Sequence, residues 1–429
     1  MSASNKYAAY IGIDWADQKH DIWQWDAETQ QKEHRVLSHT PEALNEWIQQ
    51  LQQRHPGQKI AICLEQSRGP LVYALMCHAN LVLFPVNPVT LARYRSAFTP
   101  SQAKDDPSDA EFLCELVRMH EDRLSPWRPE DEKTRQLRLL CEHRRDALGL
   151  RGRMSNRMVA LLKSYYPQAR ELAGDEIGSP IACDFLLKWT TLEQVQKAKP
   201  HAIRAFFYAH NCRSEQVIAR RLEIIQKGQP LTTDPAVIEP MALDVRMLAR
   251  LIKDLDCSIR EYDQRIKRLF DTHEDAFIFD SFPGAGAALA PRLLCAFGTD
   301  RQRYAHAHEI QTFGGIAPVV ERSGKQMWVH WRWHRPVFLC QTFYEFAQRS
   351  MVHCPWAMAY YRMQLSRGKR SHAAIRALAY KWIRILFRCW QERIPYDDRL
   401  YMDELVKRGA ELLQYLNKPE GKEPMEELA

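Results

Sequence analysis

Tyr10-Ile11-Gly12-Ile13-Asp14-Trp15 is a short apolar run that ends in a carboxylate. A second run of the same kind, Ile60-Ala61-Ile62-Cys63-Leu64-Glu65, also ends in an acid. Short apolar runs rich in β-branched residues predict buried strands. Strand ends can bring side chains from distant parts of a chain to one point. Asp14 and Glu65 are therefore the first candidates for a shared functional site.

Two further acids open a predicted helix at Asp106-Pro107-Ser108-Asp109. An aspartate before proline is a common helix start, so helix capping alone could explain this pair. The order of a strand-end Asp, a strand-end Glu and a helical Asp-x-x-Asp nevertheless matches a ribonuclease-H-like arrangement. Several carboxylates at one point suit Mg²⁺, which can activate a nucleophile and stabilise a leaving phosphate oxygen. We therefore predict a Mg²⁺ site at Asp14, Glu65, Asp106 and Asp109.

The first 125 residues alternate strand-like and helical patterns. Three strands in succession, followed by strands alternating with helices, favour a mixed sheet covered by helices. Helices are expected after Thr40, over Gly69–His78 and from Pro107 to about residue 119. The strand-like stretches are Tyr7–Trp15, His20–Asp26, His34–Leu37, Lys59–Glu65 and Leu81–Pro85. We expect an α/β domain over 1–125, with a boundary in the proline-rich stretch Ser125–Pro129.

A helical connector is predicted over 126–275. An apolar seam repeats every 3.5 residues, as in a coiled coil, with either the 137–161 helix or another subunit as its partner. The stretch from about 165 to 240 reads as short helices and loops without recognisable chemistry. The seam comprises Met241, Val245, Leu248, Ile252, Leu255, Ile259, Tyr262, Ile266 and Leu269.

Basic residues are concentrated near the C-terminus. Residues 321–395 hold 14 Lys or Arg against 3 acidic residues, together with 14 aromatics, whereas 396–429 form an acidic tail. Basic side chains neutralise phosphates and aromatics stack on unpaired bases, which indicates nucleic-acid contact. A solvated basic face over an aromatic core is the alternative. We expect a mainly helical domain over 276–395.

The whole chain is typical of a globular protein. Its 429 residues are 45% hydrophobic and 26% charged. No apolar run is long enough to span a membrane, and the first residues lack the apolar core of a signal peptide. The eleven cysteines form no Cys-x-x-Cys pair, which favours reduced thiols. We expect a cytoplasmic protein.

Two C-terminal motifs could act on a nucleic acid. The turn Pro283-Gly284-Ala285-Gly286 precedes an apolar helix and could present backbone N–H groups to phosphate, although an ordinary interhelical turn fits equally well. Ser323 lies between Arg322 and Lys325, where it could attack a phosphodiester held by cations. The alternative is a serine chosen for its turn preference.

These motifs, with Phe313-Gly314-Gly315-Ile316-Ala317-Pro318 ahead of Ser323-Gly324, resemble the DEDD insertion-sequence transposases, which are similar to the Piv DNA invertases. The resemblance implies an RNase H-like (RuvC-like) N-terminal domain, a coiled-coil connector and a C-terminal domain with a nucleophilic serine. It also implies Mg²⁺ on the four acids, a covalent link between Ser323 and cleaved double-stranded DNA, and a structured bridge RNA. Homodimers or homotetramers with composite sites are expected.

The segment after the serine departs from the family pattern. Trp328–Pro336 replaces the usual Lys-x-Gly-Asn stretch, so Arg332 and Arg335 are expected to make phosphate contacts. The predicted nucleic-acid contacts are Gly284, Gly286, Arg322, Lys325, Arg332 and Arg335. Two other functions remain open: a RuvC-like structure-specific endonuclease without a covalent intermediate, and a non-catalytic nucleic-acid-binding scaffold.

Overall fold

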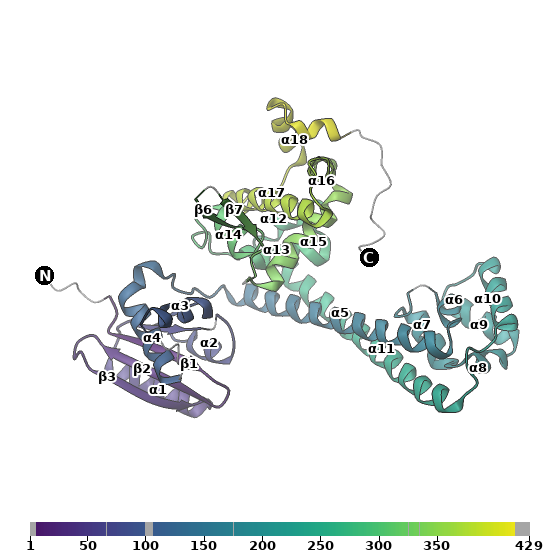
Figure 1. Cartoon of the computed structure of the whole chain (residues 1–429), viewed down its shortest axis with the longest axis horizontal. Coiled ribbons are helices and arrows are strands. Elements are labelled where there is room, and N and C mark those ends of the chain that lie inside the picture. The colour runs from purple at the N-terminus through teal and green to yellow at the C-terminus, as the bar shows by residue number, and fades with distance from the viewer. Residues whose placement is uncertain are drawn as a thin grey trace. The chain divides into compact units, whose positions relative to one another are not determined.

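Two compact units make up the chain in the computed structural model, Met1–Pro129 and Glu130–Ala429 (Figure 1). The structure describes residues 6–65, 67–98, 106–174, 176–324, 326–333 and 335–416. Within these ranges no helix combines the length and apolarity needed to cross a membrane.

The first unit contains a five-stranded mixed sheet, as the sequence predicts. The strand order is β3-β2-β1-β4-β5. β1, β2 and β3 are antiparallel neighbours, whereas β4 runs parallel to both β1 and β5. The strands are β1 (Ala9–Trp15), β2 (Lys19–Asp26), β3 (Lys32–Ser38), β4 (Ile60–Leu64) and β5 (Leu81–Pro85).

Helices cover both faces of this sheet. One face carries Ile11 and Ile62 and packs against α1 (Pro41–Arg54) and α2 (Pro70–Leu75). The other face carries Tyr10 and Cys63, among others, and packs against α3 (Pro88–Phe98) and α4 (Asp106–His120), which a short 3-10 turn, η1 (Glu121–Arg123), follows. Because side chains alternate along a strand, the two hydrophobic clusters are the two faces of one sheet.

Gly12 sets how closely α4 approaches β1. A Cβ atom at this position would lie 2.0 Å from the carbonyl oxygen of Ala110 and 2.3 Å from the backbone nitrogen of Cys114. Both distances are far shorter than van der Waals contact, so only glycine fits between this strand and the helix backbone. The close contact brings the first turns of α4 to the β1 end that carries Asp14.

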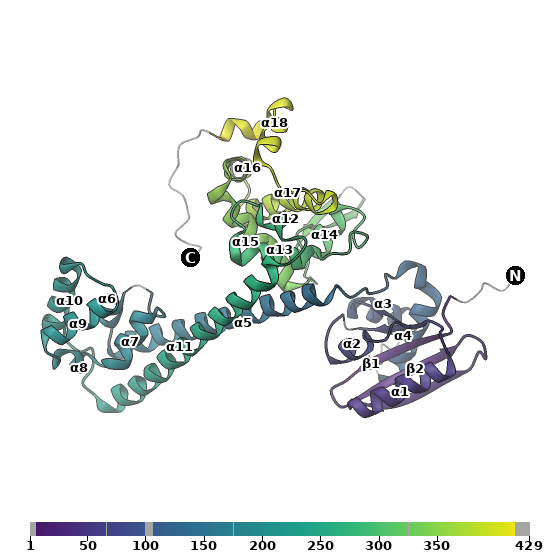
Figure 2. The same cartoon turned by 180° about the vertical axis from the view of Figure 1, so that it is seen from behind.

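Two long helices dominate the connector part of the second unit. α5 (Glu132–Tyr165) and α11 (Pro235–Asp271) lie side by side in opposite directions (Figures 1 and 2). The predicted seam lies on α11, where Val245, Leu248 and Ile252 are buried. Ion pairs bridge the two helices, including Arg151–Asp256 and Arg157–Asp244, each at 2.6 Å.

Five short helices between α5 and α11 form a separate hydrophobic core. Aromatic side chains such as Phe185 and Phe207 fill it, together with Val245 of α11. The short-helix pattern predicted for this stretch is thus present. These helices are α6 (Ala169–Ala173), α7 (Pro180–Lys188), α8 (Leu192–Gln196), α9 (Pro200–Ala209) and α10 (Glu215–Lys227).

The C-terminal part of the second unit is mostly helical. Its core contains the fully buried Trp356, Trp382 and Trp390. A two-stranded hairpin, β6 (Val319–Ser323) and β7 (Gln326–His330), interrupts the helices. The helices are α12 (Ala276–Asp280), α13 (Gly286–Phe297), α14 (Ala307–Phe313), α15 (Val337–His353), α16 (Pro355–Ser366), α17 (Ser371–Glu392), α18 (Asp398–Lys407) and the 3-10 helix η2 (Glu411–Tyr415).

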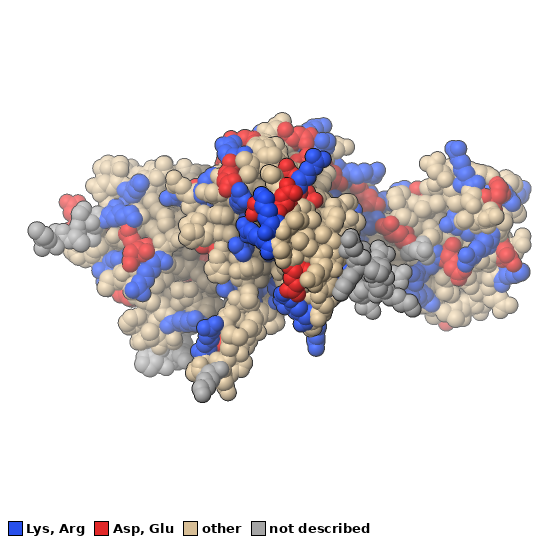
Figure 3. All heavy atoms as spheres, turned by 90° about the horizontal axis from the view of Figure 1, so that it is seen from above, with Lys and Arg blue, Asp and Glu red and all other residues tan. Residues whose placement is uncertain are grey.

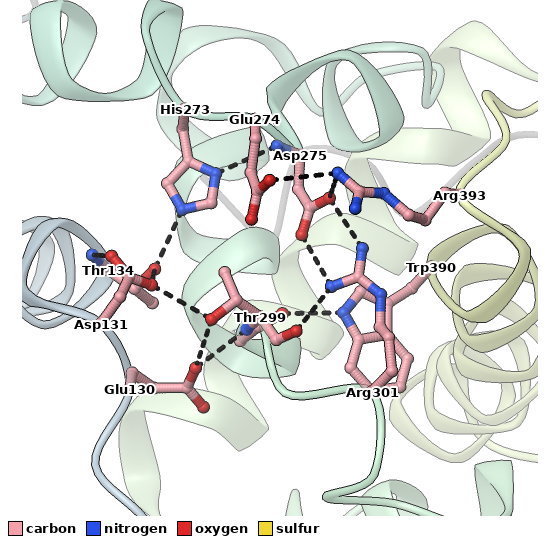
Figure 4. A network of polar contacts seen from close by, with 11 residues as sticks. Glu130, Asp131, Thr134, His273, Glu274, Asp275, Thr299, Arg301, Trp390 and Arg393 are labelled. Carbon is pink, nitrogen blue, oxygen red and sulfur yellow. Dashed lines mark hydrogen bonds and ion pairs between the residues drawn. The ribbon is translucent and has the colours of Figure 1, made fainter.

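A polar network joins the connector to this C-terminal part (Figure 4). The carboxylate of Asp275 is fully buried and accepts two 2.7 Å hydrogen bonds from Arg301. Nearby, His273 contacts Thr134 at the start of α5, at 2.9 Å between Nε2 and Oγ1. Trp390 donates from Nε1 to the carbonyl of Gly298 at 2.7 Å. Residues far apart in the sequence are thereby fixed in one body.

Candidate functional site

Asp14 and Glu65 lie at the ends of neighbouring parallel strands. Ile13 of β1 pairs with Leu64 of β4, and each acid is the residue that follows. Parallel strands end at the same edge of a sheet, so the structure brings these two predicted site residues together. Asp14 also shares its face of β1 with Gly12, the position against which α4 packs.

The other two predicted acids lie on α4, on the same face of the sheet. Asp109 directly precedes Ala110, whose carbonyl oxygen lies against Gly12, and its side chain is only 3% exposed. Asp106 is the first residue of α4 and is exposed. The elements that carry all four acids therefore meet on one side of the sheet, although Asp106 is directed more toward solvent.

Arg95 of α3 contacts the carboxylate of Asp109. Its Nη1 lies 2.6 Å from Oδ2 and also contacts Oδ1. The Arg95 side chain is 15% exposed, so this ion pair is largely removed from water. Breaking such a pair by removing one partner leaves a buried charge without compensation. Asp109 therefore sits where a positive charge is strongly favoured.

The carboxylates fit Mg²⁺ in chemistry but are not gathered around a common point. All four are hard oxygen donors, the ligands that Mg²⁺ prefers. Across the described ranges, no three His, Cys, Asp or Glu side chains are close enough together to hold a metal ion. A metal bound here would have to replace the guanidinium of Arg95 at Asp109 and draw the other acids inward.

Asp21 is a further acid at this site that sequence reasoning missed. It lies directly opposite Asp14 in the antiparallel β1–β2 pair, so both side chains point to one face. Asp21 is buried, and its Oδ1 lies 2.8 Å from Nε2 of His34 on β3. Only the strand register reveals its position, because nothing in the sequence shows that residues 14 and 21 face each other.

Ser323 lies at the tip of the β6–β7 hairpin, in the second unit. It pairs with Gln326 and shares a face of the hairpin with Glu321 and Trp328. Gly324 follows with φ +58°, a left-handed turn conformation that favours glycine. Ser323 is exposed, as is every residue of β7. Its hydroxyl is open to a large substrate, while the four acids belong to the first unit.

The two predicted phosphate-binding glycines have different roles in the fold. Gly284 has φ +80°, and a Cβ there would lie 3.0 Å from the carbonyl oxygen of Arg349 on α15. Gly286 has φ +50° and opens onto free space. Gly284 thus permits close packing of this turn against α15, whereas Gly286 leaves the start of α13 accessible to a ligand.

A pocket of about 630 Å³ lies beside the first turn of α13. Ala287 and Ala288 line it, together with Arg144, Arg145 and Arg153 of α5. Helix N-termini favour anions because their first N–H groups have no partner within the helix. The lining also includes Asp146, Asp263 and Glu345, and Arg144 and Arg145 pair with the last two, so the pocket has mixed charge and leaves both the phosphate site and the ordinary interhelical turn open.

Arg292 forms the floor of this pocket. It is 9% exposed, and its Nη1 contacts Glu345 at 2.5 Å while Nε donates to Thr342 at 3.1 Å. Burial lowers the pKa of Arg292. Burial opposes ionisation of Glu345 too, but Arg292 and Arg145 hold the pKa of that carboxyl below its usual value. Arg292, Arg145 and Glu345 therefore remain charged within this network.

The predicted basic contacts near Ser323 differ in exposure. Arg322 is exposed on the hairpin, and Lys325 lies outside the described residues. Arg335 is partly buried, with its guanidinium carbon 4.1 Å from the ring centroid of Trp331. A Cβ at Gly315 would lie 2.2 Å from Cδ of Arg335, so this side chain packs directly on the Gly315 backbone.

The aromatic residues of the basic segment fall into two groups. Trp356, Trp382 and Trp390 are buried in the core, as expected if the aromatics of this segment form a core beneath a solvated basic face. Trp328 and Trp333, in contrast, are 44% and 81% exposed. On the face drawn in Figure 3, basic and acidic side chains are interspersed, so no uniform basic surface covers it. On this face, nucleic-acid contact would therefore depend on local groups of residues.

Comparisons with known proteins agree with this architecture. Residues 11–167 match the family of DEDD transposases of the IS110 type, and residues 276–362 match the transposase family of IS116, IS110 and IS902. The first range includes the four predicted acids, and the second includes Gly284, Gly286 and Ser323.

Three individual relatives cover between 74% and 94% of this chain. A mini-circle putative transposase for IS117 from Streptomyces coelicolor is 28% identical over 412 residues, which cover 94% of this chain and 98% of the relative. The 44.8 kDa protein of insertion element IS116 from Streptomyces clavuligerus is 27% identical, over 74% of this chain and 78% of its own length. The 42 kDa protein of IS900 from Mycobacterium paratuberculosis is also 27% identical, over 78% and 83%. This chain belongs to the IS110/IS116 family of insertion-sequence transposases.

Proposed function

We propose that this transposase cuts and rejoins double-stranded DNA at the ends of its insertion element and at a target. The reaction would use Mg²⁺ held by carboxylates of the first unit and a serine nucleophile of the second. The observation that carries the proposal is the register of β1 and β4, which delivers two acids to one sheet edge beneath α4. The proposed catalytic residues are Asp14, Glu65, Asp106, Asp109 and Ser323.

An RNase H-like fold for the first unit is part of this proposal. Three antiparallel strands followed by two parallel strands, with helices on both faces, support it. Acidic residues lie at the ends of the central strands and on the helix packed across them, where an RNase H-like fold is expected to carry its carboxylates.

The carboxylates would act by holding charge close to the reacting phosphate. When bound, Mg²⁺ supplies Lewis-acid stabilisation of the developing negative charge and helps ionise the attacking hydroxyl. Asp109 would have to leave Arg95 for this. Once released, the guanidinium of Arg95 would remain near the site, where it can pair with a phosphate oxygen.

Ser323 would replace one deoxyribose oxygen on phosphorus. Its Oγ forms the new P–O bond as the bond to that oxygen breaks; the serine proton leaves to solvent, and the departing oxygen takes up a proton. The resulting phosphoserine diester conserves the energy of the broken bond, so rejoining requires no nucleotide cofactor. The exposed position of Ser323 at a hairpin tip supports access to a duplex.

A bridge RNA and a homodimer or homotetramer complete the proposal. RNA pairing would select the DNA sequences, as in other guided systems. The acids of one subunit could then meet the serine of another in a composite site. Supporting features are the open start of α13 at Gly286 and the exposed Trp328 and Trp333, which can stack on bases. The proposed contacts are Gly284, Gly286, Arg322, Lys325, Arg332 and Arg335.

Trapping of a covalent intermediate tests the proposed chemistry. Wild-type protein incubated with Mg²⁺, guide RNA and end-labelled element DNA should give a labelled protein band on a denaturing gel. Ser323→Ala should give none, while Asp109→Asn should lose both the band and strand cleavage. Cleavage by Ser323→Ala with a normal yield would instead indicate an endonuclease that uses water.

A further inference from the structure

Trp331 lies between two arginines from different parts of the second unit. The guanidinium carbon of Arg335 is 4.1 Å from the ring centroid, and that of Arg376 on α17 is 3.5 Å from it. The two guanidinium carbons are therefore at most 7.6 Å apart, the sum of those distances. Nη1 of Arg335 also donates a hydrogen bond to the backbone carbonyl of Arg332.

Within the described residues, Arg335 and Arg376 have no acidic partner. Among the ion pairs of the described residues, none involves Arg332, Arg335 or Arg376. The Nε atom of each is buried and makes no hydrogen bond. Burial lowers the pKa of Arg376, and the charge of Arg335 lowers it further, while the nearby Cys340 and Tyr344 raise it. Like charges held this close together, partly out of water, favour binding of an anion.

The fold holds the cluster in place before any ligand arrives. Arg335 packs over Gly315, where a side chain would collide with it, and Arg376 belongs to the long helix α17. Contact with the Trp331 ring restrains both guanidinium groups. Guanidinium groups bind phosphate oxygens in a planar, bidentate geometry.

We propose that Arg335 and Arg376, both in contact with Trp331, form a binding site for one phosphodiester of a nucleic-acid strand. The site deepens the proposed function and rests on it for the identity of the ligand. Arg376 and Trp331 are the new members: Trp331 lies within the Trp328–Pro336 segment but is not among the predicted contacts, and Arg376 lies in none of the motifs quoted from the sequence.

The bound phosphate is a flanking one, not the phosphate that Ser323 would attack. Trp331 follows His330, which pairs with Val319 at the base of the hairpin, whereas Ser323 is at its tip. Four residues of strand separate the two ends, which corresponds to about 14 Å at ~3.4 Å per residue. Along a duplex axis this is roughly four nucleotides of one strand. The cluster would thus set the register of the strand relative to the serine.

Salt-dependent binding tests the proposal. Fluorescence anisotropy would measure the affinity of full-length protein for a labelled DNA duplex, for the same sequence as single-stranded DNA and for its RNA copy, all with a chelator present. Arg376→Gln should weaken binding about tenfold and reduce the slope of log affinity against log salt by about one. A loss with DNA alone, with RNA alone or with both would support the site and identify the strand that it holds.

Arg384→Gln is the matched control. Arg384 is exposed on the same helix, two turns further on, and is in none of the ion pairs of the described residues. Its replacement should leave the slope nearly unchanged. Arg376→Lys keeps the charge but loses the planar fork, so it should keep the slope and bind with intermediate affinity. If Arg376→Gln fails to fold by circular dichroism, Arg335→Gln carries the same expectation.

Two results would overturn the site: a wild-type slope for Arg376→Gln with all three probes, or an equal loss for Arg384→Gln. The salt-dependence test of the phosphate site can fail independently of the covalent-adduct test of Ser323. A covalent Ser323 adduct with an unchanged Arg376→Gln slope removes only the phosphate site. A reduced slope without any adduct in wild-type protein removes only the serine chemistry.

Discussion

Asp14 of β1 lies directly opposite Asp21 of β2, with both side chains on the face of the sheet that α4 covers. Directly opposed like charges destabilise a sheet unless a positive charge compensates them. Asp21 contacts His34, and on α4 the carboxylate of Asp109 contacts Arg95. This edge of the sheet therefore gathers several carboxylates within a small region.

Mg²⁺ should stabilise the protein through this edge. Binding to the folded state alone raises the unfolding free energy by about 2.7 kcal/mol at a hundredfold excess over Kd. We expect a rise in the melting temperature with Mg²⁺, measured by circular dichroism, and its loss in Asp14→Asn. Asp17→Asn, in the exposed turn after β1, is the control and should keep the rise. An equal rise in Asp14→Asn would remove Asp14 from the metal site.

Arg95→Gln should make folding more dependent on metal. Without Arg95 the buried Asp109 carboxylate loses its partner, at an expected cost of about 3–5 kcal/mol. In chelator the variant should melt below wild type, and added Mg²⁺ should raise its melting temperature by more than it raises that of wild type. Isothermal titration should show tighter Mg²⁺ binding. An unchanged affinity would mean that Arg95 and the metal do not compete.

Gly12→Ala should damage the site without removing any acid. The added Cβ would overlap the carbonyl of Ala110, so α4 must shift away from β1. We expect a loss of about 3 kcal/mol or more in urea unfolding, and loss of DNA cleavage as Asp109 moves. Gly152→Ala, on α5 with nothing within 4 Å, should be neutral or stabilise by up to ~1 kcal/mol. Normal cleavage by Gly12→Ala would contradict this geometry.

Acid should weaken the fold through His20. Burial, and secondly the nearby His39, lowers the pKa of His20 from 6.5 to about 4. The unfolded chain therefore binds a proton that the folded chain does not between these values. The stability that His20 gives the fold is fully present above pH 6.5. As the pH drops from 6.5 toward 4, the free energy of unfolding falls by up to about 3 kcal/mol. Urea unfolding at several pH values should show a flatter profile for His20→Gln; parallel profiles would contradict the assignment.

The sequence predicts the parts of this fold that have strong local patterns. The apolar runs ending at Asp14 and Glu65 are strands, and the Asp106–Asp109 segment opens a helix. The helix Pro88–Phe98 escaped prediction because only Leu91 of its residues is buried, so it has little apolar periodicity. The hairpin at 319–330 lies within a region expected to be mainly helical.

The relationships within the site depend on tertiary contacts and could not be predicted. Asp21 faces Asp14 only because β2 pairs with β1 in one register. Arg95 reaches Asp109 across two helices, and Arg376 reaches Trp331 from a separate helix. Each of these residues is unremarkable in its own sequence context. Sequence patterns identify acids and basic segments, whereas the partners of each charge emerge only from the packed structure.

The hairpin that carries Ser323 has almost no hydrophobic support of its own, since all of β7 and most of β6 are exposed. Isolated two-stranded hairpins are only marginally stable in water. The proposed nucleophile therefore depends on whatever docks against the ribbon to hold it still. If Ser323 is the nucleophile, docking of DNA or of a second subunit on this hairpin would decide when its hydroxyl is held in position to react.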